Sequence, residues 1–116
     1  MEIDVFTSLN GIPEEAINNK TIIVVDVLRA TTTITAALAA GCLEVIPVPT
    51  PEEAIALRER LDDERVLLGG ERNVLKIPGF NLGNSPLEYT PEIVAGKRLI
   101  ITTTNGTQAI NRAAHG

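Results

Sequence analysis

Asp26 is the first residue of this sequence that could do chemistry, because it directly follows an apolar run and precedes a polar turn. A carboxylate in that position can hold a divalent cation, act as a general base or attack phosphorus. It can equally cap a helix or brace a loop, and the residue type alone does not decide between these roles. Asp26 is therefore a candidate catalytic residue with a structural alternative.

Arg29 follows shortly after Asp26, beside the threonine-rich start of a predicted helix. An arginine next to the unpaired N–H groups of a helix start is a ready anion site, suited to phosphate or sulfonate. The alternative is a surface arginine paired with an acid such as Glu71. We interpret Arg29 as a candidate catalytic residue. Thr31 and Thr32 are candidate substrate-binding residues that could also be simple helix caps.

The segment Gly69-Gly70-Glu71-Arg72 places an acid and a base directly after flexible backbone. Glycines let a ligand approach main-chain N–H groups closely. The alternative is an ordinary turn with a solvent-exposed ion pair. On the functional interpretation, Glu71 is a candidate catalytic residue, and Gly70 and Arg72 are candidate substrate-binding residues.

Two further polar segments read GFNLGNSP, over 79–86, and TTTNGT, over 102–107. The second could be a plain turn and N-cap, but its hydroxyls and amides could equally line an oxyanion pocket. Ligands of open α/β sheets bind beyond the carboxyl ends of the strands, where such segments gather. The candidate substrate-binding residues of the two segments are Asn84, Ser85, Thr104, Asn105, Gly106 and Thr107.

The elements that must position these residues alternate between strand and helix. Short alternating or β-branched runs predict strands, and alanine-rich or capped runs predict helices. The predicted strands are Ile3–Phe6, Thr21–Val25, Glu44–Val48, Val66–Leu68 and Arg98–Thr102; the predicted helices are 31–41, Pro51–Leu61 with Thr50 as N-cap, and one beginning near Thr107. Residues 70–91 look irregular. The pattern predicts an α/β fold with a largely parallel or mixed open sheet and helices on both faces.

Composition narrows the class of protein. The 116 residues fit one small domain, and the net charge of −5 with scarce aromatic residues makes nucleic acid an unexpected partner. Cys42 is the single cysteine, which favours a reducing compartment, so we expect a cytoplasmic protein. The N-terminus does not resemble a secretory signal, and the apolar runs are too short to span a membrane.

Three segments taken together are far more specific than any single turn. VVDVLRATTTITAAL, LLGGERNVLKIPGFNLGNSP and ITTTNGTQAI occur in this order. They strongly resemble the 2-phosphosulfolactate phosphatase family of coenzyme M biosynthesis, and the resemblance covers essentially the whole chain. It implies a three-layer α/β/α fold and magnesium-dependent hydrolysis of (2R)-phospho-3-sulfolactate to (2R)-3-sulfolactate and phosphate.

The resemblance also assigns roles to residues of this chain. A substrate with a phosphate and a sulfonate needs two anion sites, for which Arg29 and Arg72 are the natural candidates. Mg²⁺ needs hard oxygen ligands, which Asp26 and Glu71 could supply. Whether Asp26 binds metal or attacks phosphorus stays open.

Family members are considerably longer than this chain, so we interpret residues 1–116 as a single α/β domain that corresponds to the N-terminal half of such a protein. A sheet edge left uncovered would favour a homo-oligomer. Two alternatives to the named activity follow: a truncated, inactive anion-binding domain, and a phosphatase for another small phosphorylated hydroxy acid.

Overall fold

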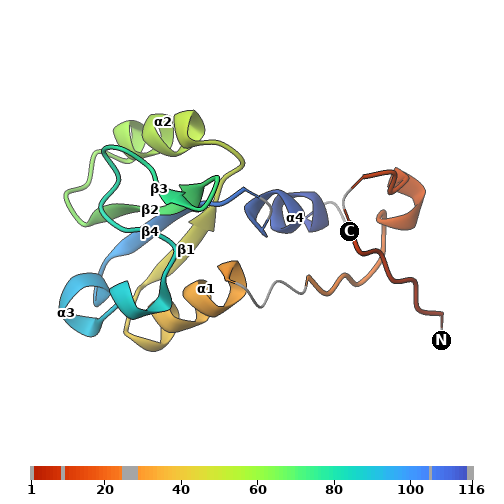
Figure 1. Cartoon of the computed structure of the whole chain (residues 1–116), viewed down its shortest axis with the longest axis horizontal. Coiled ribbons are helices and arrows are strands. Elements are labelled where there is room, and N and C mark those ends of the chain that lie inside the picture. Colours follow the sequence, from red (N-terminus) through yellow and green to blue (C-terminus); the bar gives the residue numbers. More distant parts are fainter. Residues whose placement is uncertain (1, 9, 25–28, 105, 115–116) are drawn as a thin grey trace.

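The computed structural model describes residues 2–8, 10–24, 29–104 and 106–114. Within these ranges the elements in chain order are η1 (Glu14–Ala16), α1 (Ala30–Ala39), β1 (Glu44–Pro47), α2 (Pro51–Leu61), β2 (Val66–Arg72), β3 (Leu75–Lys76), η2 (Pro86–Glu88), α3 (Pro91–Val94), β4 (Arg98–Thr102) and α4 (Gly106–Ala113) (Figure 1). Helices and strands alternate along most of the chain, as expected for the α/β class.

The strands form one sheet in the order β1-β4-β2-β3. β4 lies between β1 and β2 and runs parallel to both, with Glu44 and Val66 on either side of Arg98. β3 is antiparallel and pairs only with the end of β2, where Glu71 lies opposite Lys76. The sheet is therefore mixed and open. We call the edge where β1, β4 and β2 end, together with the loops that follow them, the carboxyl edge.

β4 supplies side chains to both faces of the sheet. Leu99, Ile100 and Ile101 have no exposed surface, which stabilises the fold by roughly 1.5–3 kcal/mol for each side chain. Leu99 and Ile101 pack in the layer of α1 and α3, and Ile100 packs against Ala54 in the layer of α2. Figure 1 shows α2 on one side of the strands and α1 with α3 on the other. The three-layer α/β/α arrangement is thus confirmed.

The helix Pro51–Leu61 has the predicted bounds because its start and end signals are local. The hydroxyl oxygen of Thr50 accepts a hydrogen bond from the Glu53 amide at 3.2 Å, and Pro51 takes a position that needs no intrahelical donor. Asp62 ends the helix in the left-handed conformation, with φ of 44°. The strand Arg98–Thr102 also has the predicted bounds.

The predicted strands Ile3–Phe6 and Thr21–Val25 were wrong where the structure describes them. Residues 2–8 and 21–24 are not in strands, and Ile3 and Ile23 are 74% and 84% exposed; Val25 lies outside the described residues. A β-branched run becomes a strand only where a neighbouring strand supplies hydrogen bonds. The helices α1 and α3 cover the same face of the sheet. A right-handed crossover from residues 21–25 through α1 to β1 would therefore place a strand at 21–25 on the side of β1 where β4 lies.

The prediction that residues 70–91 are irregular was wrong in three places. β2 continues to Arg72, turns at Asn73 and Val74, and pairs with β3; η2 and α3 follow. Asn73 and Val74 have φ of 54° and 61°, which closes a tight hairpin without the glycine that usually marks one. The residue types at this turn therefore did not predict the hairpin.

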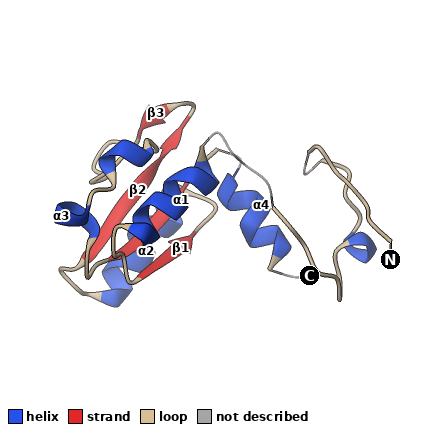
Figure 2. Cartoon of the chain, turned by 90° about the horizontal axis from the view of Figure 1, so that it is seen from below, coloured by secondary structure: helices blue, strands red, loops and turns tan. Residues whose placement is uncertain are grey.

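The described N-terminal residues, 2–8 and 10–24, lie beyond α4 and away from the sheet in both views (Figures 1 and 2). The guanidinium of Arg112 in α4 donates a hydrogen bond to the carbonyl of Ile12. The longest described helix has 11 residues, whereas a membrane-spanning helix needs about 20. In the described part of the chain, no helix could cross a membrane.

Candidate functional site

The carboxyl edge brings together two of the loops that the sequence singled out. The parallel pairing sets Gly70 of β2 opposite Thr102 of β4, so the segments 69–72 and 102–104 meet there. The helix α1 contacts α4, and the chain continues from the end of α1 into the start of β1. The start of α1 therefore lies near the carboxyl edge. Three segments far apart in the sequence therefore lie close together, as predicted for ligand binding beyond the strand ends.

Glu71 is a buried acid at this edge, only 9% exposed. One carboxylate oxygen accepts the amide of Thr104 at 2.6 Å; the other accepts the Val74 amide at 2.9 Å and the Thr104 hydroxyl at 3.0 Å. Burial alone would raise the pKa of Glu71, but these hydrogen bonds outweigh it and lower the pKa below its ordinary value. Glu71 is therefore an ionised acid that holds two loops together.

Arg72 braces the same loops from its own side of β2. Its guanidinium donates to the carbonyl of Pro49 at 3.0 Å, to the Thr102 hydroxyl at 2.7 Å and to the carbonyl of Thr103 at 3.3 Å. The buried Nε of Arg72 has no partner among the described residues. Arg72 thus joins the ends of β1, β2 and β4. Its role as an anion site stays a prediction.

The two glycines before Glu71 serve packing within the sheet. A Cβ on Gly69 would clash with the hydroxyl of Tyr89, and a Cβ on Gly70 would clash with the carbonyl of Thr102. Gly70 also has φ of 134°, which other residues rarely adopt, and its amide donates to the carbonyl of Leu82 at 3.1 Å. The predicted close approach at these glycines is made by the chain itself, and ligand binding by Gly70 stays a prediction.

The loop from β4 into α4 is closed by two threonines. The amide of Thr103 donates to the Thr107 hydroxyl at 3.1 Å, and the amide of Thr107 donates to the Thr103 hydroxyl at 3.0 Å. The hydroxyl of Thr104 accepts the amide of Asn73 at 3.1 Å while it donates to Glu71. The amides of Thr103, Thr104 and Thr107 are therefore committed within the chain, which leaves none of the three directed at an oxyanion.

The start of α1 has donors of a different kind. The amide of Thr33 donates to the carbonyl of Arg29 at 2.9 Å, a bond of the first turn of α1. Arg29 takes the N-cap position without a capping side-chain bond, and both Arg29 and Thr31 are exposed. Among the described residues, the Arg29 guanidinium has no ion pair, so the alternative of pairing with Glu71 is not seen. Thr32 is also exposed.

Asn84 and Ser85 reach the same helix from the segment before η2. The hydroxyl of Thr33, a residue with no exposed surface, donates to the carbonyl of Asn84 at 2.9 Å. Asn84 is 8% exposed, and its side-chain oxygen has no partner among the described residues. The Ser85 amide donates to the Glu88 carboxylate at 3.3 Å. Asn84 therefore lies against the first turn of α1.

Two predicted site residues, Asp26 and Asn105, lie outside the described residues. Gly106 is the first residue of α4, as expected for a turn that leads into a helix.

The described residues do not by themselves form a magnesium site. No group of three or more acids, histidines or cysteines that could hold a metal lies within them. Glu71 already accepts three hydrogen bonds, and a carboxylate offers only about four lone pairs. Of the two predicted magnesium ligands, Asp26 and Glu71, the Glu71 carboxylate thus already uses most of its lone pairs in hydrogen bonds.

Sequence reasoning missed the residues that hold the carboxyl edge together by hydrogen bonds within the chain. Thr102, Thr103 and Pro49 accept from Arg72, and Val74 donates to Glu71. The run of threonines after a buried strand is a local signal for a hydrogen-bonded loop. The partners in β2 lie about thirty residues away, as for the Arg72–Thr102 bond, and a local pattern does not reveal them.

Comparison with known sequences gives one consistent result. The sequence model of the family described as 2-phosphosulpholactate phosphatase matches residues 6–116. A "Probable 2-phosphosulfolactate phosphatase" of Clostridium novyi (strain NT) is 51% identical over 113 residues, and one of Clostridium acetobutylicum is 53% identical over 110 residues. One from Caldanaerobacter subterraneus subsp. tengcongensis is 50% identical over 114 residues.

These matches cover 97%, 95% and 98% of this chain, and 48%, 46% and 47% of the three relatives. The chain thus spans about half the length of the curated relatives it matches.

Proposed function

Because this chain belongs to the 2-phosphosulpholactate phosphatase family, we propose that it provides the anion-binding part of a phosphatase for (2R)-phospho-3-sulfolactate. The reaction hydrolyses the phosphate ester to (2R)-3-sulfolactate and phosphate. The observation that carries this proposal is the family match over residues 6–116. The polar carboxyl edge supports it, because this is where ligands bind in open α/β sheets.

The start of α1 is the proposed binding place for an anionic group of the substrate. Arg29 supplies an exposed guanidinium, and Thr31 an exposed hydroxyl, at the N-terminus of this helix. Such a start favours negative charge through its N–H groups and its dipole. Phosphoryl transfer needs positioning and neutralisation of charge, which these groups can provide.

The braced loops at the ends of β2 and β4 form the wall of the proposed site. Glu71 and Arg72 hold the segment 102–104, and Thr103 with Thr107 holds the start of α4. A wall with satisfied hydrogen bonds keeps its shape when a charged substrate arrives, and so avoids the cost of reorganisation. Ligand contacts of Gly70, Arg72, Asn84, Ser85, Thr104, Asn105, Gly106 and Thr107 belong to this proposal.

The family resemblance implies Mg²⁺, and bound Mg²⁺ would neutralise charge on the phosphate. Asp26 is the proposed oxygen ligand, or else the nucleophile. The cytoplasm is the proposed location, in agreement with the free thiol of Cys42 in the core.

The experiment measures release of inorganic phosphate from (2R)-phospho-3-sulfolactate by the wild-type chain, by Asp26→Asn and by the wild type with a chelator. We expect release from the wild type and its loss in both other samples. Lack of turnover by the folded wild type with this substrate and with a panel of other phosphate monoesters would reject the phosphatase for this chain.

A second candidate function is an inactive anion-binding domain, which the exposed Arg29 at the start of α1 also supports. It predicts that the chain binds phosphate or the substrate without turnover, and that a chelator leaves this binding unchanged. Calorimetric titration with phosphate, run beside the release assay, separates the two candidates. A phosphatase for another phosphorylated hydroxy acid would show release only within the panel.

A further inference from the structure

We infer that Glu71 is a positioning residue that holds the loop between β4 and α4, and that it does so in place of binding a metal ion. The inference deepens the proposed function, on which its link to catalysis rests, because this loop forms a wall of the proposed site. It starts from a disagreement: the residue types favour Glu71 as a magnesium ligand, whereas its oxygens are engaged elsewhere.

The first step is the saturation of the carboxylate. Both oxygens of Glu71 accept hydrogen bonds, one from the Thr104 amide at 2.6 Å and the other from the Val74 amide and the Thr104 hydroxyl. A metal ion would have to displace these donors or share the oxygens with them. The described residues contain no group of three or more acids, histidines or cysteines that could hold a metal ion, so they supply no ligand set that would offset such a loss.

The second step is the position of the donors. Thr104 belongs to the loop after β4, and Val74 belongs to the hairpin between β2 and β3. The Thr104 hydroxyl also accepts the Asn73 amide at 3.1 Å, which ties the same two segments a second time. Glu71 is thus the centre of a network that fixes one loop against the other.

The third step is the backbone that Glu71 holds. Val74 has φ of 61°, a left-handed conformation that is unfavourable for a β-branched residue. Its side chain is 82% exposed, so burial does not hold it there. The bond from the Val74 amide to Glu71 is a contact that favours this conformation. The acid therefore fixes a strained hairpin tip and the Thr104 loop together.

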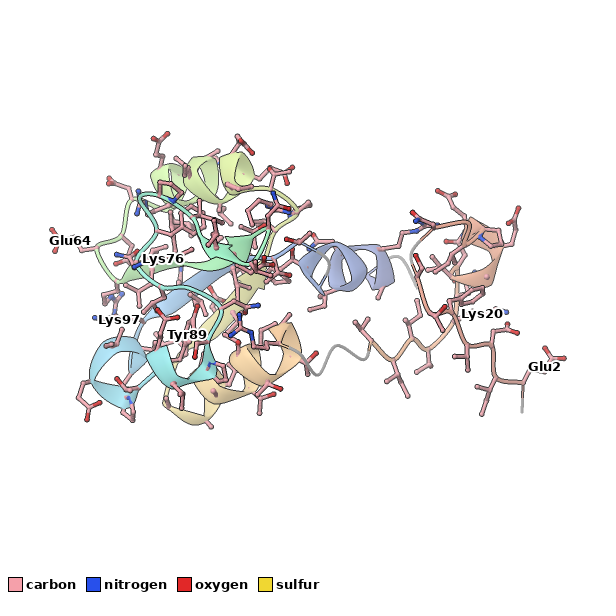
Figure 3. The ribbon with its side chains drawn as sticks, in the orientation of Figure 1. Glu2, Lys20, Glu64, Lys76, Tyr89 and Lys97 are labelled. Atoms are coloured by element: carbon pink, nitrogen blue, oxygen red, sulfur yellow. The ribbon has the colours of Figure 1, made fainter. Side chains whose placement is uncertain are left out.

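The test measures hydrogen exchange of the Thr104 and Val74 amides by NMR in the wild-type chain, in Glu71→Gln and in the control Glu64→Gln. Glutamine keeps the size of the side chain but removes the charge and turns one acceptor into a donor. Glu64 is an exposed acid before β2, and Figure 3 shows it pointing outward at the end of the molecule away from α4. Glu64→Gln therefore matches the change in charge without touching the network.

We expect Glu71→Gln to speed exchange at both amides about tenfold or more, because charge-assisted hydrogen bonds are lost. Glu64→Gln should leave both rates unchanged. If Glu71→Gln does not fold, Thr104→Val serves instead: it keeps the Thr104 amide and the charge of Glu71 but removes the hydroxyl. Faster exchange at the Asn73 amide is then expected. Unchanged exchange in the folded variant would overturn the inference.

The second readout is an NMR titration of the same protein samples with MgCl₂. We expect the Thr104 and Val74 signals of the wild type to stay in place, and any Mg²⁺ affinity seen at other residues to be the same in Glu71→Gln. A shift of the two signals, or a tenfold weaker Mg²⁺ affinity in Glu71→Gln, would show that Glu71 is a ligand. Neither readout needs turnover, so a failure of the phosphatase proposal is a separate result.

Discussion

At the scale of single residues, the polar side chains of the carboxyl edge fall into two groups. Glu71, Arg72 and Thr104 make their hydrogen bonds within the chain. Arg29 and Thr31, at the start of α1, are exposed. We therefore expect changes in the first group to act mainly on stability and order, and changes in the second group to act mainly on binding.

Glu71 gives a prediction about stability and pH. Its pKa is lowered from the ordinary value of 4.5 in the folded chain, so its ionised form stabilises the fold. This contribution is fully present above pH 4.5 and is lost as the pH falls from there through the lowered pKa. The sign follows because the unfolded chain takes up the proton first.

Urea unfolding of the wild type and Glu71→Gln from about pH 7 down to about pH 3 measures this contribution. We expect the wild type to be more stable near neutral pH, and the difference to shrink below pH 4.5. A difference that stays constant through this range would show that the charge of Glu71 does not stabilise the fold.

At the scale of elements, the hairpin between β2 and β3 is the strained part of the edge. Asn73 and Val74 both have positive φ, and Val74 is 82% exposed. Val74→Gly should relieve the strain, and we expect it to raise the free energy of unfolding by about 1 kcal/mol after the entropic cost of glycine.

Chemical unfolding of Val74→Gly beside a matched control tests this expectation. Val5 is also 82% exposed and is not among the residues of positive φ, so Val5→Gly should leave stability unchanged or slightly lower. Equal effects of the two substitutions would mean that the left-handed backbone at Val74 is not strained.

Elements were predictable where the signal was local. Thr50, Pro51 and the left-handed Asp62 define α2 within a few residues of its ends, and the β-branched run Arg98–Thr102 is buried on both faces of the sheet. The run Thr21–Val25 is also rich in β-branched residues, yet its described part is not in a strand. Composition shows that a run can form a strand, but the strand itself depends on a partner far away in the sequence.

The sequence predicted which loops meet at the candidate site, but it did not predict the hydrogen bonds between them. The rule for strand ends in α/β sheets correctly brought the segments 69–72 and 102–104 together. That Glu71 would spend its oxygens on Thr104 and Val74 could not be predicted, because it depends on the register of β2 with β4 and on a hairpin without glycine. Asp26, the first candidate of the sequence, lies outside the described residues.

At the scale of the whole molecule, the N-terminal segment exposes apolar side chains, and apolar surface of this kind can mark an interaction site. Ile3, Val5 and Ile23 of the N-terminal segment are 74%, 82% and 84% exposed, and β1 lies at the border of the described sheet. These features support the expectation of a homo-oligomer.

Light scattering coupled to size-exclusion chromatography checks self-association. We expect the measured mass of the wild-type chain to rise with concentration, because burying the exposed side chains is favourable. The double variant Ile3→Asp with Ile23→Asp should have a lower mass at the same concentration. A wild-type chain that is monomeric at every concentration would contradict this expectation.

We propose a phosphatase site at the carboxyl edge, with the start of α1 as the part that receives the anion. The most direct test is steady-state release of phosphate from (2R)-phospho-3-sulfolactate by the wild-type chain and by Arg29→Gln. We predict release by the wild type and a KM raised about tenfold or more in the variant, because a charge-assisted hydrogen bond is lost. No release by the folded wild type, or equal kcat and KM in the two proteins, would contradict the account.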